Sequence, residues 1–201
     1  MIKGVLFDFD GTLTQPGALD FPAIKRELEC PLDHSILEYL EAQPACRRSG
    51  LMKILEEREE AAAEASLPNR GAEECLSALK QRETLLGILT RNSLKSVEKA
   101  LQRFESIAID DFVAVITRDS SLPKPHPDGV HQAARQMGIT PSELLVVGDF
   151  RFDVMAGKAA GASTVLLANR GRAVMEQGDP APDYTVGSIK EIVGIVESLQ
   201  G

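Results

Sequence analysis

The chain has 201 residues, of which 43% are hydrophobic and 26% charged, and this is the composition of a folded domain rather than of a disordered segment. Its formal net charge of -8 argues against a nucleic-acid partner, because binding a phosphate backbone requires broad positive surfaces. A small anionic substrate is compatible with this charge, since it needs only a local pocket of positive charge.

Cysteine usage and hydropathy predict a cytoplasmic protein. Cys30, Cys46 and Cys75 form no Cys-x-x-Cys pair, and an odd number of cysteines does not indicate a disulfide framework. The first apolar run does not resemble a signal peptide, because Asp8 and Asp10 interrupt it. Other apolar runs are too short to span a bilayer. We therefore expect reduced thiols and no membrane partner.

Short apolar runs rich in Val, Ile and Leu recur along the chain, each followed by a turn and then by a stretch with helical spacing. This alternation is typical of an α/β fold in which helices cover a parallel sheet. The expected strands are residues 2–8, 85–90, 112–117, 144–148 and 164–167, with a weaker sixth at 184–186.

Several helices are expected between these strands. Residues 93–104 carry apolar side chains at helical intervals. Residues 127–137 begin with proline and are followed by glycine, in keeping with helix-end preferences. Thr140 and Glu143 have the spacing of a capping box before the fourth strand. A further helix is expected at residues 154–160.

Residues 15–69 interrupt the alternation, because they contain helical stretches at 21–29, 35–42 and 51–65 but no convincing strand. Both borders of this segment are rich in turn-forming residues. We therefore predict a helical domain at residues 15–69, inserted into a core formed by residues 1–14 and 70–201. The acidic run at 56–60 is interpreted as the solvated face of a helix.

Two carboxylates follow the first strand directly. Asp8 and Asp10 run into Gly11 and Thr12 at the edge where a parallel sheet binds ligands. Two neighbouring acids repel one another, and a divalent cation such as Mg²⁺ would offset this repulsion. One such aspartate alone would equally fit a turn before glycine.

A second acidic pair follows the fourth strand, where Asp149 comes after Gly148 and Asp153 lies four residues later. If the first and fourth strands are neighbours, Asp149 falls beside Asp8 and adds a metal-directed carboxylate. The alternative for Asp149 and Asp153 is that they cap a helix.

Groups suited to phosphate follow the second and third strands. Thr90 ends the second strand, and Arg91 and Asn92 form a turn whose N–H groups suit an anion. The alternative is that Thr90 or Ser93 is an ordinary helix N-cap. Lys124 lies between two prolines that fix the backbone and could aim the ammonium inward, although most single loop lysines are exposed.

Together these motifs resemble the haloacid dehalogenase superfamily. They read DFDGTLT, ILTRNS, PKPHPD and GDFRFD in the order typical of that superfamily, and the resemblance covers essentially the whole chain. It implies a Rossmann-like, doubly wound parallel sheet with a helical cap inserted after the first motif. Within the superfamily the layout is most similar to phosphoglycolate phosphatase relatives, although Gln15-Pro16 replaces the usual Asp-Ser pair.

The resemblance implies a phosphatase that uses Mg²⁺ and acts on a small phosphorylated metabolite. Asp8 would be the nucleophile that forms an aspartyl-phosphate. Asp10 would act as general acid and then as general base, while its backbone carbonyl binds the metal. The side chains of Asp8 and Asp149 would be metal ligands, and Asp153 would orient them from just outside or through water.

By the same resemblance, Thr90 and Lys124 would bind the transferring phosphoryl oxygens, and Lys124 would also stabilise the charge on Asp8. The turn of Arg91 and Asn92 stays a further candidate for binding phosphate. Phosphate monoester hydrolysis is among the slowest uncatalysed reactions. Several convergent charges are therefore required together.

Asp10 also separates the members of the superfamily, because its dehalogenases and phosphonatases lack an acid two residues after the nucleophile. Phosphomutases of the beta-phosphoglucomutase type keep this acid and are the leading alternative. A binding or regulatory protein without turnover is the second alternative. Arg47 and Arg48, beside Ser49-Gly50 at an expected helix junction, could contact an anionic substrate, or they could be solvated loop arginines.

Overall fold

Six strands, of which the first five consist largely of buried residues, form one parallel sheet in the computed structural model, which describes residues 1–168 and 175–200. The strand order is β3-β2-β1-β4-β5-β6. All six expected strands are present, and the first three are shorter than expected. The strands are β1 (Gly4–Phe7), β2 (Leu85–Leu89), β3 (Ala114–Ile116), β4 (Leu144–Gly148), β5 (Ser163–Leu167) and β6 (Tyr184–Val186).

The order of the strands reverses at β1. Both β2 and β4 pair with β1, so Phe7 lies opposite Ile88 on one side and opposite Val147 on the other. The three strands therefore end side by side, at the switch point where sheets of this kind bind ligands. The predicted α/β fold with a Rossmann-like, doubly wound sheet is confirmed.

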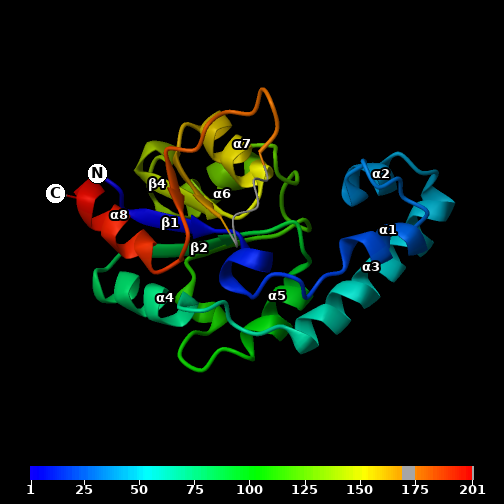
Figure 1. The fold of residues 1–201 in the computed structure, drawn as a ribbon, viewed down its shortest axis with the longest axis horizontal. Helices are drawn as coiled ribbons and strands as arrows, with labels where there is room; N and C mark the ends of the chain where they lie inside the picture. The colour runs from blue at the N-terminus through cyan, green and yellow to red at the C-terminus, as the bar shows by residue number, and fades with distance from the viewer. Residues whose placement is uncertain (169–174, 201) are drawn as a thin grey trace.

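Helices cover both faces of the sheet, because successive side chains of a strand point to opposite faces. Val5 and Phe7 belong to one hydrophobic cluster, and Leu6 belongs to another. The helices of the first cluster are α4 (Ala72–Gln81), α5 (Leu94–Leu101) and α8 (Glu191–Gln200). Those of the second are α6 (Asp128–Met137) and α7 (Arg151–Ala160). Figure 1 shows the two layers on opposite sides of the sheet.

Three further helices extend away from the sheet and form a lobe of their own (Figure 1). They are α1 (Phe21–Glu27), α2 (Ile36–Glu41) and α3 (Ala45–Ala65), and we call them the inserted helices. Their apolar sides pack together around Leu28, Leu40 and Leu55. Thr14 and Pro68 form a β-bridge, so the two connecting segments lie together. The division into a core at 1–14 and 70–201 and a cap at 15–69 stays a prediction.

Several helices differ from the expected bounds. Helix α3 begins at Ala45, so Arg47 and Arg48 lie in its first turns rather than at a helix junction. The Ser49-Gly50 pair does not break it, because glycine inside a helix costs only about 1 kcal/mol and packing outweighs this cost. Helix α4 was not predicted. None of the described helices combines the length and the apolar character needed to cross a membrane.

Helix α4 supplies a test of the packing on the first face. Leu76 is fully buried, and replacing it by alanine leaves a cavity. We expect Leu76→Ala to lower the free energy of unfolding by about 2–5 kcal/mol in urea denaturation. Leu94→Ala is the matched control, because Leu94 is largely exposed on α5 and its loss should cost under about 0.5 kcal/mol. Equal losses in the two variants would contradict the packing described here.

Candidate active site

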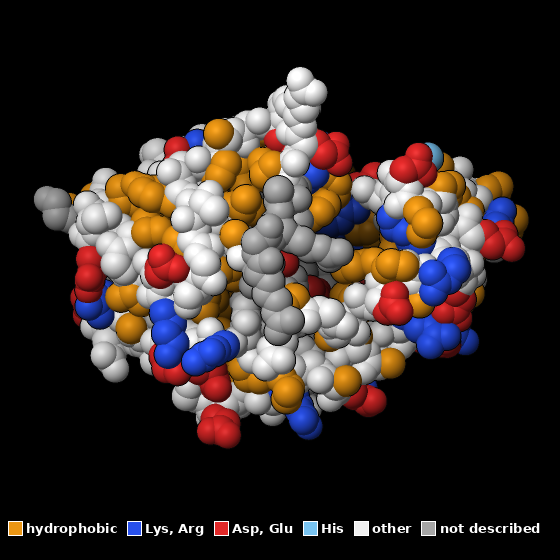
Figure 2. All heavy atoms as spheres, viewed as in Figure 1, with side chains coloured by type: hydrophobic (Ala, Val, Ile, Leu, Met, Phe, Trp, Pro, Cys, Tyr) orange, Lys and Arg blue, Asp and Glu red, His pale blue; other side chains and the backbone are white. Residues whose placement is uncertain are grey.

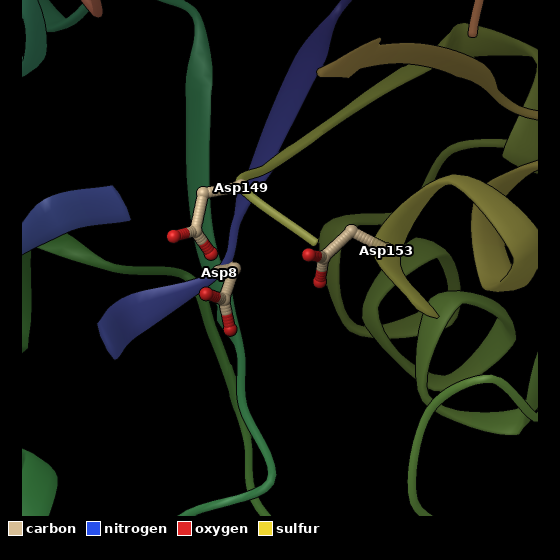
Figure 3. A group of neighbouring side chains, drawn as sticks. All are labelled: Asp8, Asp149 and Asp153. Carbon is tan, nitrogen blue, oxygen red and sulfur yellow. The ribbon is translucent and has the colours of Figure 1, made fainter. Parts of the chain in front are cut away.

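Three carboxylates gather where β1 and β4 end. Asp8 follows β1 directly, Asp149 follows β4, and Asp153 lies in the first turn of α7. Each offers a carboxylate oxygen that lies within 4.8 Å of those of the other two, and Figure 3 shows the three side chains converging. Because β1 and β4 are neighbours, Asp149 lies beside Asp8 as the strand pattern predicted.

Two glycines make room for these acids. A Cβ atom on Gly148 would lie 2.1 Å from the carboxyl carbon of Asp153, and one on Gly11 would lie 2.4 Å from Oδ2 of Asp149. Gly11 also has a φ of +84°, a conformation that disfavours side chains. Any other residue at either position would push the carboxylates apart.

The Lys124 ammonium lies in the same place and is only 4% exposed. Its Nζ donates hydrogen bonds to Oδ1 of Asp8 and Oδ1 of Asp153, each at 2.5 Å, and to the carbonyl of Leu89 at 2.8 Å. Burial alone would lower the pKa of Lys124, but Asp153 and Asp8 outweigh it and raise this pKa. The exposed-loop alternative for Lys124 is therefore wrong.

Asp10 occupies a different environment from Asp8. Burial, followed by the nearby charge of Asp8, raises the pKa of Asp10 to about 6. Nδ2 of Asn92 donates to Oδ2 of Asp10 at 3.0 Å, which orients the carboxyl group. A carboxyl group with a pKa near neutrality can both give and take a proton under the same conditions.

The turn after β2 lies at the edge of the same site. Thr90 is buried, and its hydroxyl oxygen accepts the backbone N–H of Asn92 at 3.1 Å. Ser93 is the N-cap of α5, because its side chain accepts the N–H of Ser96. The helix-cap alternative therefore holds for Ser93 and not for Thr90.

Arg91 reaches from this turn to the inserted helices. Its guanidinium donates to both carboxylate oxygens of Glu38 on α2, at 3.0 and 2.6 Å, and also to the carbonyl of Lys124. The guanidinium carbon lies 5.1 Å from the centre of the Phe152 ring. Arg91 thus joins the strand ends to α2 through its side chain.

The carboxylates open into a cleft of about 1070 Å³ between the strand ends and the inserted helices. Figure 2 shows this hollow between the two lobes of the molecule. Asp8, Asp10, Thr90 and Lys124 are among the residues that line it. Predicted site residues from the ends of β1, β2 and β4 and from the loop after β3 therefore share one cleft. The volume of this cleft is typical of small-molecule sites.

Arg47 and Arg48 are not among the described residues that line the cleft. Nη2 of Arg47 donates to Glu29 at 2.5 Å, and Nη2 of Arg48 donates to the carbonyl of Gln43 at 3.1 Å. Both side chains are thus engaged within the inserted helices, and the structure does not bring them to the carboxylates.

Comparison with known proteins places the chain in a family. Residues 2–161 match the family described as haloacid dehalogenase-like hydrolase. The chain belongs to this family. A haloacid dehalogenase-like hydrolase domain-containing protein of Arabidopsis thaliana is 30% identical, over 98% of this chain and 84% of that protein. The resemblance inferred from the four motifs is confirmed.

Two further matches add detail. One relative is named for a particular activity, and one solved structure covers almost the whole chain. A phosphoglycolate phosphatase of Pasteurella multocida is 31% identical, over 61% of this chain and 54% of that protein. The crystal structure of a hydrolase from Pseudomonas syringae has a TM-score of 0.80 at 20% identity and covers 98% of this chain and 99% of that one. The structural match shows that the two chains share a fold.

This haloacid dehalogenase-like hydrolase also has a buried ion pair that the sequence pattern did not predict. Nη1 of Arg118 lies 2.6 Å from both carboxylate oxygens of Glu59, and the two side chains are 6% and 7% exposed. Glu59 belongs to α3 and lines the cleft, whereas Arg118 follows β3. The pair therefore connects the inserted helices to the core.

The interpretation of residues 56–60 as a solvated face is wrong for Glu59. The buried residues of α3 are Leu51, Leu55, Glu59 and Ala63, so Glu59 occupies an inward position at a spacing of four. This spacing is the sequence signal that could have identified Glu59 as a buried residue. Burial raises the pKa of Glu59 to about 7, although Arg118 opposes the shift.

Removing Arg118 should therefore destabilise the fold in a pH-dependent way. Arg118→Met leaves the Glu59 carboxylate buried without a cation, and we expect the free energy of unfolding to fall by about 3–5 kcal/mol near neutral pH. The pKa of Glu59 lies above its ordinary value of 4.5, so the folded state binds its proton more tightly. Stability then decreases as pH rises, and the loss should be larger at about pH 9 than at about pH 5.

Urea denaturation at both pH values measures this effect. In the double variant Arg118→Met/Glu59→Leu the unpaired charge is absent, so most of the stability should return. Arg58→Met is the matched control, because Arg58 forms an exposed pair with Glu27, and its loss should leave the free energy of unfolding almost unchanged at both pH values. A loss in Arg118→Met that is the same at both pH values would contradict the buried pair.

Proposed function

We propose that the chain is a Mg²⁺-dependent phosphatase that hydrolyses a small phosphate monoester through an aspartyl-phosphate on Asp8. The observation that carries this proposal is the convergence of Asp8, Asp10, Asp149 and Lys124 at the carboxyl ends of neighbouring strands. Carboxylates are established nucleophiles in phosphoryl transfer. The Pasteurella multocida relative, which is named a phosphoglycolate phosphatase, supports the choice of phosphate ester.

The donor set suits a hard divalent cation. The three clustered carboxylates offer only oxygen ligands, and Mg²⁺ prefers a few carboxylates together with water and phosphate oxygens. The side chains of Asp8 and Asp149 and the backbone carbonyl of Asp10 would hold Mg²⁺, and Asp153 would position this shell while bound to Lys124. The ion would offset the repulsion among the acids and stabilise negative charge on the phosphoryl oxygens.

The first chemical step joins Asp8 to the substrate. A carboxylate oxygen of Asp8 attacks phosphorus, and the bond from phosphorus to the ester oxygen breaks. The leaving alkoxide takes a proton from Asp10, whose pKa of about 6 leaves part of it protonated near neutral pH. Lys124 and the backbone turn at 90–92 bind the phosphoryl oxygens during the transfer.

The second step restores the enzyme. Asp10, now ionised, accepts a proton from water, and the oxygen of that water attacks phosphorus. The bond between phosphorus and Asp8 breaks, so inorganic phosphate leaves and the Asp8 carboxylate is regenerated. Asn92 keeps the Asp10 carboxyl in one orientation through both steps.

The presence of Asp10 also favours a phosphatase over the dehalogenases and phosphonatases of the family. Haloacid dehalogenases and phosphonatases do not need an acid two residues after the nucleophile, whereas a phosphate ester needs its leaving oxygen protonated. The proposal includes a cytoplasmic location, which is consistent with three free cysteines.

Loss of Asp8 should abolish turnover. Asp8→Asn removes the nucleophile, so we expect Mg²⁺-dependent release of phosphate from p-nitrophenyl phosphate to fall at least about 10³-fold. EDTA should stop the unaltered enzyme, and added Mg²⁺ should restore it. Asp110→Asn is the matched control, because Asp110 is exposed and does not line the cleft, and it should keep full activity.

A folded, Mg²⁺-loaded preparation that releases no phosphate from a broad panel of esters would sink the proposal. Phosphate that moves between two positions of a sugar phosphate in the presence of a bisphosphate, without release, would instead favour the phosphomutase alternative.

Loss of the Asp10 carboxylate should separate proton transfer from metal binding. In Asp10→Asn the side chain can no longer exchange a proton, so kcat should fall about 10²–10⁴-fold. The backbone carbonyl remains, so calorimetry should find Mg²⁺ affinity close to that of the unaltered protein. Loss of Mg²⁺ binding in this variant would show that the side chain, and not the carbonyl, is the ligand.

A further inference from the structure

The wall of the cleft opposite the carboxylates contains a group of apolar side chains beside several polar ones. It belongs to the inserted helices and the segments beside them, and its apolar members are Leu19, Phe21, Pro22, Leu32, Ile36, Leu37 and Leu55. Phe21 is 51% exposed and Leu32 is 68% exposed, although large apolar side chains are normally buried. Figure 2 shows hydrophobic side chains within the hollow. Exposed apolar groups gathered in a cleft indicate a binding surface.

Aromatic rings also reach the cleft from the core. Phe150 and Phe152 line it at the start of α7, and their rings meet edge to face with centres 5.0 Å apart. The Phe152 ring is held by the guanidinium groups of Arg91 and Arg151, at 5.1 and 5.9 Å from its centre. Phe150 remains 42% exposed. The cleft therefore presents Phe150 on a fixed support and Phe21 from the inserted helices.

Among the described residues, the charges that line the cleft favour an uncharged leaving group over a second anionic group. Seven carboxylates but only four lysines and arginines line it among the described residues. Each of these cations has a partner: Lys25 donates to the carbonyl of Leu32, and Arg91 pairs with Glu38. Arg151 pairs with Glu176 and Asp179, and Lys124 pairs with Asp8 and Asp153. Three of these cations are thus paired with carboxylates, so an anionic leaving group would have to displace a carboxylate or bind Lys25, whose ammonium donates only to a carbonyl.

We propose that the substrate is a phosphate monoester of an uncharged alcohol that carries an aromatic ring, and that this ring packs against Phe21 and Phe150. The inference rests on the proposed phosphatase function and names the class of its substrate. The phosphoryl group occupies the carboxylate end of the cleft, and the ring occupies the apolar end. Burying such a ring is worth about 10- to 100-fold in kcat/KM.

The test compares esters whose chemistry is alike and whose apolar area differs. Ethyl phosphate and 2-phenylethyl phosphate both release a primary alkanol of similar basicity, so a difference in rate reports binding of the ring. We expect kcat/KM for 2-phenylethyl phosphate to exceed that for ethyl phosphate by about 10- to 100-fold. 2-Phosphoglycolate, which is close to ethyl phosphate in size but carries a second anion, should fall below ethyl phosphate.

Variants of the two phenylalanines test where the ring binds. Phe21→Ala and Phe150→Ala should each reduce the preference for 2-phenylethyl over ethyl phosphate about 3- to 10-fold, mainly through KM. Leu94→Ala is the matched control, because Leu94 is an exposed apolar residue outside the cleft lining, and it should leave the preference unchanged.

The outcomes separate this inference from the function on which it rests. Release of phosphate with equal kcat/KM for the two alkyl esters, or with 2-phosphoglycolate as the best substrate, overturns the substrate class and leaves the phosphatase in place. A preference that survives both phenylalanine variants overturns the proposed position of the ring. No release from any ester by folded, Mg²⁺-loaded protein overturns the phosphatase function and the substrate class together.

Discussion

The buried ammonium of Lys124 is the interaction on which the site depends. Carboxylates as close as Asp8, Asp149 and Asp153 repel one another, and burying unpaired charges costs several kcal/mol for each ion. Lys124 uses its three donors on Asp8, Asp153 and the carbonyl of Leu89. One side chain thus ties the loop after β3 to the ends of β1 and β2 and to the start of α7.

The sheet topology makes this convergence possible. Because β1 lies between β2 and β4, the residues that follow β2 and β4 lie beside Asp8, although they are about 80 and about 140 positions away from it in the chain. Gly11 and Gly148 then allow the backbones to approach closely enough for the carboxylates to meet. The chemistry of these residues and the topology of the sheet therefore indicate the same site.

Helix α3 connects the other two inserted helices to the site. Its C-terminal half lies along α5, where Lys95 pairs with Glu60 and Lys99 pairs with Glu64. Exposed pairs of this kind contribute little, so the buried Glu59–Arg118 pair is the more consequential link. The middle of α3 supplies Leu55 to the cleft lining. A single helix thereby connects the apolar side chains of the cleft to the core that carries the clustered carboxylates.

The sequence by itself determined the strands, the alternation with helices and the four motifs, because aliphatic runs, glycine and proline act locally. It also indicated Asp8, Asp10 and Asp149, since carboxylates directly after strands share one edge of a parallel sheet. Tertiary structure decided which of two local meanings applied: Lys124 is buried rather than exposed, and Ser93 rather than Thr90 caps α5. It also decided that Glu59 faces inward and that Arg47 and Arg48 do not reach the cleft. The physical reason is that burial and charge pairing depend on neighbours distant in the chain, such as Arg118 for Glu59, which no local pattern specifies.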